Sequence, residues 1–170
     1  AGTAAGPASL RLRNTTRPAD ELARDDGALL LRNALIDTAT GTLLPIPAHL
    51  RAGPEPGAYI AQADGPISES FRRIVTGSGA QVVSYLPNNA YLVQANSRQS
   101  ASIAAQAGVR AVIPFEPYFK LEPGLLAKAV NQEPVGAGAR LNLTLLPGTR
   151  DESLVRLQQL GATVVNEFRT

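Results

Sequence analysis

The sequence has no cysteine, no tryptophan, no methionine and a single histidine among its 170 residues. The absence of cysteine excludes disulfides, thiol nucleophiles and zinc–thiolate sites. With His49 alone, a multi-histidine metal site is excluded, and any catalytic triad would have to use that residue. Aromatic residues make up only 5% of the chain, which disfavours a stacking platform for nucleic-acid bases.

Charge of one sign and long apolar runs are also scarce. The net charge is +2, from 16 basic and 14 acidic residues, and so weak a field predicts neither a nucleic-acid partner nor an anionic membrane. No stretch approaches the roughly 18 apolar residues of a membrane-spanning helix, so we expect no membrane insertion. Apolar residues still make up 44% of the chain, which is enough for a packed core.

Residues 1–57 are predicted to form an exposed arm, a hairpin and a Pro/Gly connector. Alternating residues at 10–13 indicate one short strand, and residues 18–24 allow a helical turn. Two apolar runs, at 28–38 and 43–46, surround a Gly-containing turn, which predicts a hairpin. Prolines 45 and 47 restrict the second arm to a sheet edge or an extended tail.

Residues 58–114 contain the clearest pattern, a β-α-β-β-α-β order. Strands are expected at residues 58–63, 80–86, 90–95 and 109–114. The first helix opens at Gly65-Pro66, and the second, capped by Ser97, covers about 98–107. This order predicts an α+β fold of the ferredoxin-like, split β-α-β type, with an antiparallel sheet and two helices on one face.

The remainder is predicted to be a linker at 122–138, with room for a helical turn at 125–130, and half of a second module at 139–170. Leu141, Leu143 and Leu145 alternate with polar residues, a helix starts at a Thr149-x-x-Glu152 capping box, and a strand follows at 162–168. The sequence GAQVV at 79–83 matches GATVV at 161–165. We interpret this as an internal duplication, although any two β-α-β units that end in this way look alike.

The second copy stops after its second strand. The β-α-β that completes the first copy has no counterpart in it, and a two-stranded ribbon with one helix is marginally stable alone. We therefore expect either that the protein continues beyond Thr170 or that a partner chain supplies the missing half.

Catalytic and cofactor motifs are missing. There is no P-loop, no G-x-S-x-G and no H-E-x-x-H. The first Gly-x-Gly, at 77–79, ends a helix instead of opening one, and the second, at 136–138, precedes a strand, so neither suits dinucleotide phosphates. His49 lies in a Pro-rich connector, where a surface or packed histidine is the expected role. We expect no catalytic residue, no metal and no cofactor in this chain.

Three motifs resemble the inhibitor-like propeptide of bacterial subtilisin-family serine proteases: AYIAQADGPI at 58–67, GAQVVSYLPNNAYLV at 79–93 and VRAVIPFEPYFKL at 109–121. The resemblance implies a domain that assists folding of the protease and then inhibits it. Its sheet would pack on two surface helices of the catalytic domain, while an extended tail occupies the substrate cleft. The catalytic Asp, His and Ser would lie on a downstream polypeptide, and the protein would be secreted or periplasmic.

The resemblance leaves two candidates for the cleft-binding tail, residues 115–121 and residues 166–170. Thr170 is also a candidate processing site. Tyr85 and Tyr91 flank a turn and could equally form a cross-strand pair. The candidate cleft or partner contacts are Tyr85, Tyr91, Phe115, Tyr118, Phe119, Leu121, Phe168, Arg169 and Thr170.

The function expected is therefore that of the non-catalytic N-terminal portion of a subtilisin-like serine protease. It would act as folding assistant and inhibitor, or as an associated structural subunit of the processed enzyme. The alternatives are a free-standing ferredoxin-like binding or regulatory module that oligomerises, and an adhesive or surface structural domain.

Overall fold

A computed structural model describes residues 10–167 of the chain. The chain divides into two compact units, Ala1–Val135 and Gly136–Thr170, and each is described here by itself. In unit 1 the elements are, in chain order, β1 (Leu12–Arg13), α1 (Ala19–Leu22), β2 (Ala28–Leu30), β3 (Ala34–Asp37), η1 (Ala48–Leu50), β4 (Ala58–Ala63), α2 (Glu69–Gly77), β5 (Gln81–Leu86), β6 (Ala90–Gln94), α3 (Ser97–Ala104), β7 (Val109–Pro114), α4 (Pro117–Lys120) and α5 (Pro123–Val130).

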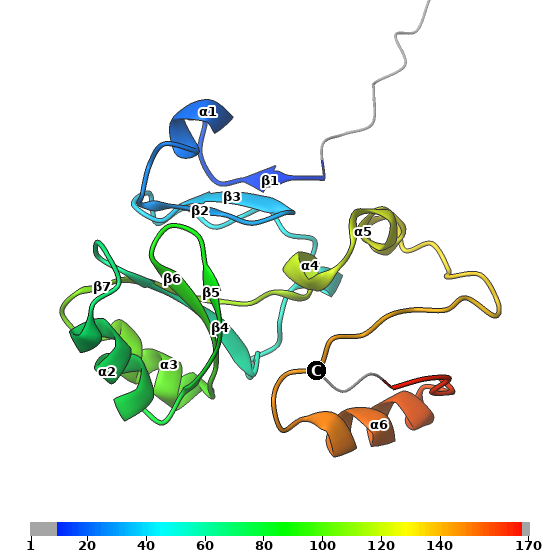
Figure 1. Ribbon diagram of the computed structural model, residues 1–170. Helices are drawn as coiled ribbons and strands as arrows, with labels where there is room; N and C mark the ends of the chain where they lie inside the picture. Colours follow the sequence, from blue (N-terminus) through cyan, green and yellow to red (C-terminus); the bar gives the residue numbers. More distant parts are fainter. Residues whose placement is uncertain (1–9, 168–170) are drawn as a thin grey trace, which may run out of the picture. The chain divides into compact units, whose positions relative to one another are not determined.

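A four-stranded antiparallel sheet forms the centre of unit 1. Its strand order is β5-β6-β4-β7, and all three neighbouring pairs are antiparallel. The helices α2 and α3 lie together on one face of this sheet (Figure 1). The predicted ferredoxin-like α+β fold is confirmed. The strands β4 and β7 have the predicted bounds, because each is a mostly apolar run that ends at turn residues.

The two helices begin at residues other than those predicted. Ser68 caps α2 by accepting a hydrogen bond from the backbone N–H of Phe71 at 3.2 Å, so this helix starts three residues after Pro66. For α3 the cap is Asn96, not Ser97. Asn96 and Gln99 form a reciprocal capping box, with bonds of 2.8 and 2.9 Å. An oxygen-bearing side chain that satisfies free N–H groups fixes the helix start more strongly than a proline does.

An apolar core lies between the sheet and the two helices. Phe71 and Val75 of α2 and Ile103 of α3 are buried against alternate residues of the strands. Small alanines at positions 61 and 63 of β4 let the helices approach the sheet closely. The periodicity of two in the strands and 3.6 in the helices therefore brings these side chains to one layer.

The opposite face of the sheet is covered by the chain's own N-terminal residues. In this N-terminal layer β3 lies between β1, which is parallel to it, and β2, which is antiparallel. Leu29 and Ile36 of the layer share a core with Ile60 and Ala90 of the four-stranded sheet. Residues 28–50 thus form a packed layer, while in the arm predicted at 1–27 only Leu22 is buried among the described residues.

The predicted hairpin is also different. Its two strands, β2 and β3, both lie within the first apolar run, and their turn is at residues 31–33. Residues 43–46 form no strand, because Pro45 lacks the N–H that a ladder needs. Leu44 and Ile46 are nevertheless buried, and the Arg51 side chain donates hydrogen bonds to both of their carbonyls, at 2.9 and 3.0 Å.

The chain after β7 turns back into unit 1. The short helix α4 places Tyr118 in the core, and α5 places Leu126 there, at 1% and 0% exposure. Where the sequence predicted a linker with at most one turn, α5 has two turns. It starts at Pro123, which suits the first turn of a helix because that position needs no N–H donor.

Unit 2 contains the helix α6 (Arg150–Gln159) between two irregular segments, residues 139–149 and 160–167. The helix is confirmed, but the strands expected at 141–145 and 162–168 are absent from the described residues. Thr149 makes no capping bond to α6, and its hydroxyl donates to the Leu146 carbonyl instead, at 2.9 Å. A strand exists only when another strand pairs with it, and the two segments do not pair with each other.

Candidate functional site

The strand β5 is an open edge of the four-stranded sheet. It pairs with β6 on one side, and no described strand pairs with it on the other. Its sequence, QVVSYL, contains neither charge nor proline, which are the usual protections of an edge against further pairing. A bulge interrupts the pairing between Val82 and Ser84. Tyr85 near its end is 59% exposed, so β5 offers both free backbone groups and an aromatic side chain.

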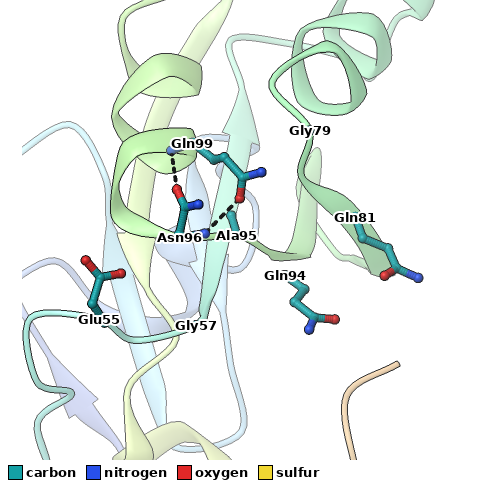
Figure 2. Close-up of a pocket in the computed structure, with 8 residues that line it drawn as sticks. All are labelled: Glu55, Gly57, Gly79, Gln81, Gln94, Ala95, Asn96 and Gln99. Atoms are coloured by element: carbon teal, nitrogen blue, oxygen red, sulfur yellow. Dashed lines mark hydrogen bonds between the residues drawn. The ribbon is translucent and has the colours of Figure 1, made fainter. Parts of the chain in front are cut away.

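A shallow hollow of about 400 Å³ lies at the start of this strand. Figure 2 shows the side chains around it, which come from β5, from the end of β6, from the start of α3 and from the loop before β4. The lining residues are Glu55, Gly57, Gly79, Gln81, Gln94, Ala95, Asn96 and Gln99.

Four amide side chains, those of Gln81, Gln94, Asn96 and Gln99, line this hollow, and we call it the amide hollow. The Asn96 and Gln99 side chains are oriented by the capping box described above, as the dashed lines in Figure 2 mark. The Glu55 carboxylate accepts a hydrogen bond from the backbone N–H of Ser97 at 3.2 Å. The side-chain carbonyl of Gln94 is buried and has no partner among the described residues. Gln94 lies directly opposite Gln81 in the ladder.

Glycine is required at one wall of the hollow. Gly79 has a φ of +82°, and a Cβ there would lie 2.9 Å from the Gln99 side-chain nitrogen. A side chain there would be strained by the positive φ and would displace the Gln99 amide. Neutral donors and acceptors beside an open strand edge suit the backbone amides of an extended peptide, which would lengthen the sheet by one strand.

Two of the predicted contact residues, Tyr85 and Tyr91, occupy opposite positions on β5 and β6, so the cross-strand pair is confirmed. Their exposures differ sharply. Tyr91 is 7% exposed and stacks on Phe71 of α2, with ring centroids 5.8 Å apart. Tyr85, at the edge, has its ring largely in solvent. Only Tyr85 of this pair is available to a partner.

The predicted tail at 115–121 is folded into unit 1. Tyr118 is 1% exposed, its hydroxyl donates to the Leu10 carbonyl at 2.6 Å, and burial raises its pKa. The Asn33 side chain donates to the carbonyls of Tyr118 and Leu121, at 3.0 and 2.8 Å. Phe115, Phe119 and Leu121 are half-buried against the same core. In this structure the segment is therefore part of the core of unit 1 and not an extended tail.

The remaining predicted residues, Phe168, Arg169 and Thr170, lie outside the described residues. Sequence reasoning missed the amide hollow. One signal for it was present, because Asn96-x-x-Gln99 is itself a capping-box pattern. The convergence of Glu55, Gln81 and Gln94 depends on the sheet order, which places residues far apart in sequence at one end of the sheet.

The other chemically active side chains serve structure. His49 is exposed, and its Nε2 lies 2.8 Å from the Ala129 carbonyl, which ties η1 to α5. Arg17 bridges Asp25 and Asp37 at 2.6 and 3.0 Å. Within residues 10–167, no three carboxylate or imidazole groups gather where they could hold a metal ion. None of the helices described there is long and apolar enough to span a bilayer.

Comparisons with known proteins identify one family. A family model described as a domain of unknown function, DUF8729, matches residues 24–116, which is more than half of the chain. The match begins in the N-terminal layer, between α1 and β2, and ends just after β7. It therefore includes β2 and β3 on one face of the four-stranded sheet, the sheet itself, and the two helices on its other face. Neither a curated protein nor a solved structure matches the chain.

Proposed function

The chain belongs to the DUF8729 family, and from the form of this domain we propose that it is the non-catalytic N-terminal part of a secreted or periplasmic subtilisin-like serine protease. The observation that supports this is the four-stranded sheet β5-β6-β4-β7 with both helices on one face. This is the architecture that the subtilase propeptide resemblance implies, over the same residues that carry the resemblance.

Of the roles open to such a domain, the geometry favours an associated structural subunit over an inhibitor of the cleft. An inhibitor needs a free sheet face and a free tail. Here Ile60 and Gln62, on the face opposite the helices, are both 0% exposed. Of the two tail candidates, the one at 115–121 is held in place by hydrogen bonds from Asn33.

The docking site that remains is the open edge of β5 with Tyr85 and the amide hollow. A strand of the catalytic polypeptide would pair with the backbone of β5. Its polar groups would form hydrogen bonds with the side chains of Gln81 and Gln94. Tyr85 would supply buried apolar area, since tyrosines are frequent anchors of interfaces.

A second candidate function is a free-standing binding module, which the covered sheet face favours. A propeptide normally presents that face to its protease, whereas here the chain's own residues 10–50 bury it. In this alternative the edge of β5 would bind an extended peptide that is not part of a protease.

The test is a pull-down from the extracellular or periplasmic fraction of the source organism with the tagged 170-residue chain. A fluorophosphonate probe, which labels active serine hydrolases, identifies a protease among the captured proteins. We expect one labelled polypeptide larger than the bait. Tyr85→Ala should weaken its capture by about tenfold, equivalent to about 1.4 kcal/mol.

Leu43→Ala is the matched control, because Leu43 is 79% exposed and lies outside β5. This variant should capture the protease as the unaltered chain does. Capture of peptides or proteins without any labelled hydrolase, still sensitive to Tyr85→Ala, would replace the protease proposal by the free binding module.

A further inference from the structure

The amide hollow carries one negative charge. Glu55 is the single charged residue among those that line it. Its carboxylate accepts a hydrogen bond from the backbone N–H of Ser97, and no ion pair within the described residues involves it. All the lining residues lie within the stretch 24–116 that the family model matches. The hollow and its charge therefore belong to the matched domain itself.

The hollow offers acceptors that lack a donor. The side-chain oxygens of Asn96 and Gln99 are already used, because each accepts a backbone N–H in the capping box. The acceptors that remain for a ligand include the Glu55 carboxylate and the buried side-chain carbonyl of Gln94, which has no donor among the described residues. A buried carbonyl without a donor is energetically costly, so a ligand that donates to it is favoured. The amide nitrogens of Asn96 and Gln99 suit backbone carbonyls of the same ligand.

A group that binds Glu55 must reach it from the edge of the sheet. The carboxylate is held at the end of β6, because Ser97, its hydrogen-bond donor, follows closely after that strand. A strand added to β5 would lie two strand spacings from β6, roughly 10 Å. Figure 2 shows Gln81 and Gln94 on the side of the hollow opposite Glu55, so the incoming side chain would pass these amides. Lysine and arginine have both the long stem and the charge that this path requires.

We propose that the amide hollow is a specificity pocket for a basic side chain, arginine in preference to lysine, on the strand that adds to β5. The guanidinium pairs with the Glu55 carboxylate and donates to the Gln94 carbonyl. It carries N–H donors on each of its nitrogen atoms, so it can serve two acceptors in different directions, whereas the lysine ammonium is a point charge. This inference rests on the proposed docking at β5 and adds the residue by which the docking strand is recognised.

The test is a selection of random phage-displayed peptides, about twice the length of β5, on the immobilised 170-residue chain. We expect arginine to be enriched at one position of the selected peptides. A synthetic selected peptide should bind about tenfold less tightly, by fluorescence polarisation, when citrulline replaces this arginine. Citrulline keeps the length and shape of the side chain and removes its charge. Added salt should reduce the difference between the two peptides.

Two matched variants locate the preference. Glu55→Gln keeps an acceptor for the Ser97 N–H and removes the charge, so the arginine and citrulline peptides should bind this variant equally well. Glu69→Gln is the control, because Glu69 is exposed and lies in the first turn of α2, at the far end of that helix from Gly79. This variant should keep the full preference for arginine.

Three results would overturn the proposal: selected peptides without a basic position, a preference for arginine that Glu55→Gln leaves unchanged, and a selection that enriches no peptide. Each would leave the protease proposal standing if a labelled hydrolase is still captured in a manner sensitive to Tyr85→Ala. Conversely, a preference for arginine without any captured hydrolase would reject the protease and assign the pocket to the peptide ligand of a free binding module.

Discussion

At the scale of single residues, a few polar side chains inside unit 1 hold its layers together. Gln62 of β4 is fully buried, and its Nε2 donates to the carbonyls of Asn88 and Gly27, at 3.0 and 3.3 Å. Its Oε1 lies 2.8 Å from the Thr38 hydroxyl. Asn88 in turn donates to the Ala28 carbonyl at 2.7 Å. One buried network thus connects the sheet, the β5–β6 turn and the N-terminal layer.

Substitution of Gln62 should be costly. In Gln62→Leu the shape is nearly kept, but the Asn88 carbonyl and the Thr38 hydroxyl lose the Gln62 amide as partner, while the Gly27 carbonyl still accepts from Thr38 at 2.6 Å. An unsatisfied buried group costs about 1–3 kcal/mol, so we expect a loss of that order in the free energy of unfolding measured with urea. Gln106→Leu, at an exposed glutamine after α3, should change it by less than about 0.5 kcal/mol. Equal effects of the two variants would show that the network contributes nothing.

At the scale of elements, the sequence predicted those strands and turns whose positions depend on local patterns. The bounds of β4 and β7 follow from apolar runs, and the turn at Asn88-Asn89, with φ of 65° and 62°, suits asparagine. Features that depend on distant partners were missed. The turn at 31–33 was read as part of one apolar segment although it contains Arg32 and Asn33. The fold of Tyr118 into the core depends on Asn33, 85 positions earlier. The strands of unit 2 were predicted from their alternation, which does not show whether a pairing strand is present.

The stability of the N-terminal layer should depend on pH. A hydrogen bond from Arg17 is the main cause that lowers the pKa of Asp25, and the backbone N–H of Gly27 adds to it. A lowered carboxyl pKa means that this contribution to stability is present above the unfolded-state pKa, about 3.9, and is lost as the pH falls below it. The urea midpoint should therefore fall between pH 6 and pH 3.

Asp25→Asn keeps the acceptor for the Gly27 N–H, at 2.8 Å in the unaltered chain, and removes the charge that faces Arg17. The variant should be less stable than the unaltered chain at pH 6, and its midpoint should fall less between pH 6 and pH 3. Parallel losses in the two proteins would show that Asp25 does not contribute to the acid sensitivity.

At the scale of the whole molecule, two kinds of surface are left for association. The open edge of β5 with Tyr85 belongs to unit 1, and the uncovered leucines belong to unit 2. The face of the sheet that the propeptide resemblance assigned to the protease is filled by residues 10–50. Sequence motifs predict the strands of a module. They do not predict which face of its sheet is covered by the rest of the chain.

The central claim is that this chain is the non-catalytic part of a protease, and intact-mass analysis of natively purified material under denaturing conditions tests it most directly. The account predicts a second, larger chain that co-purifies and reacts with the serine probe. Material that contains the 17.8 kDa chain alone, folded and without a probe-reactive companion, would contradict it.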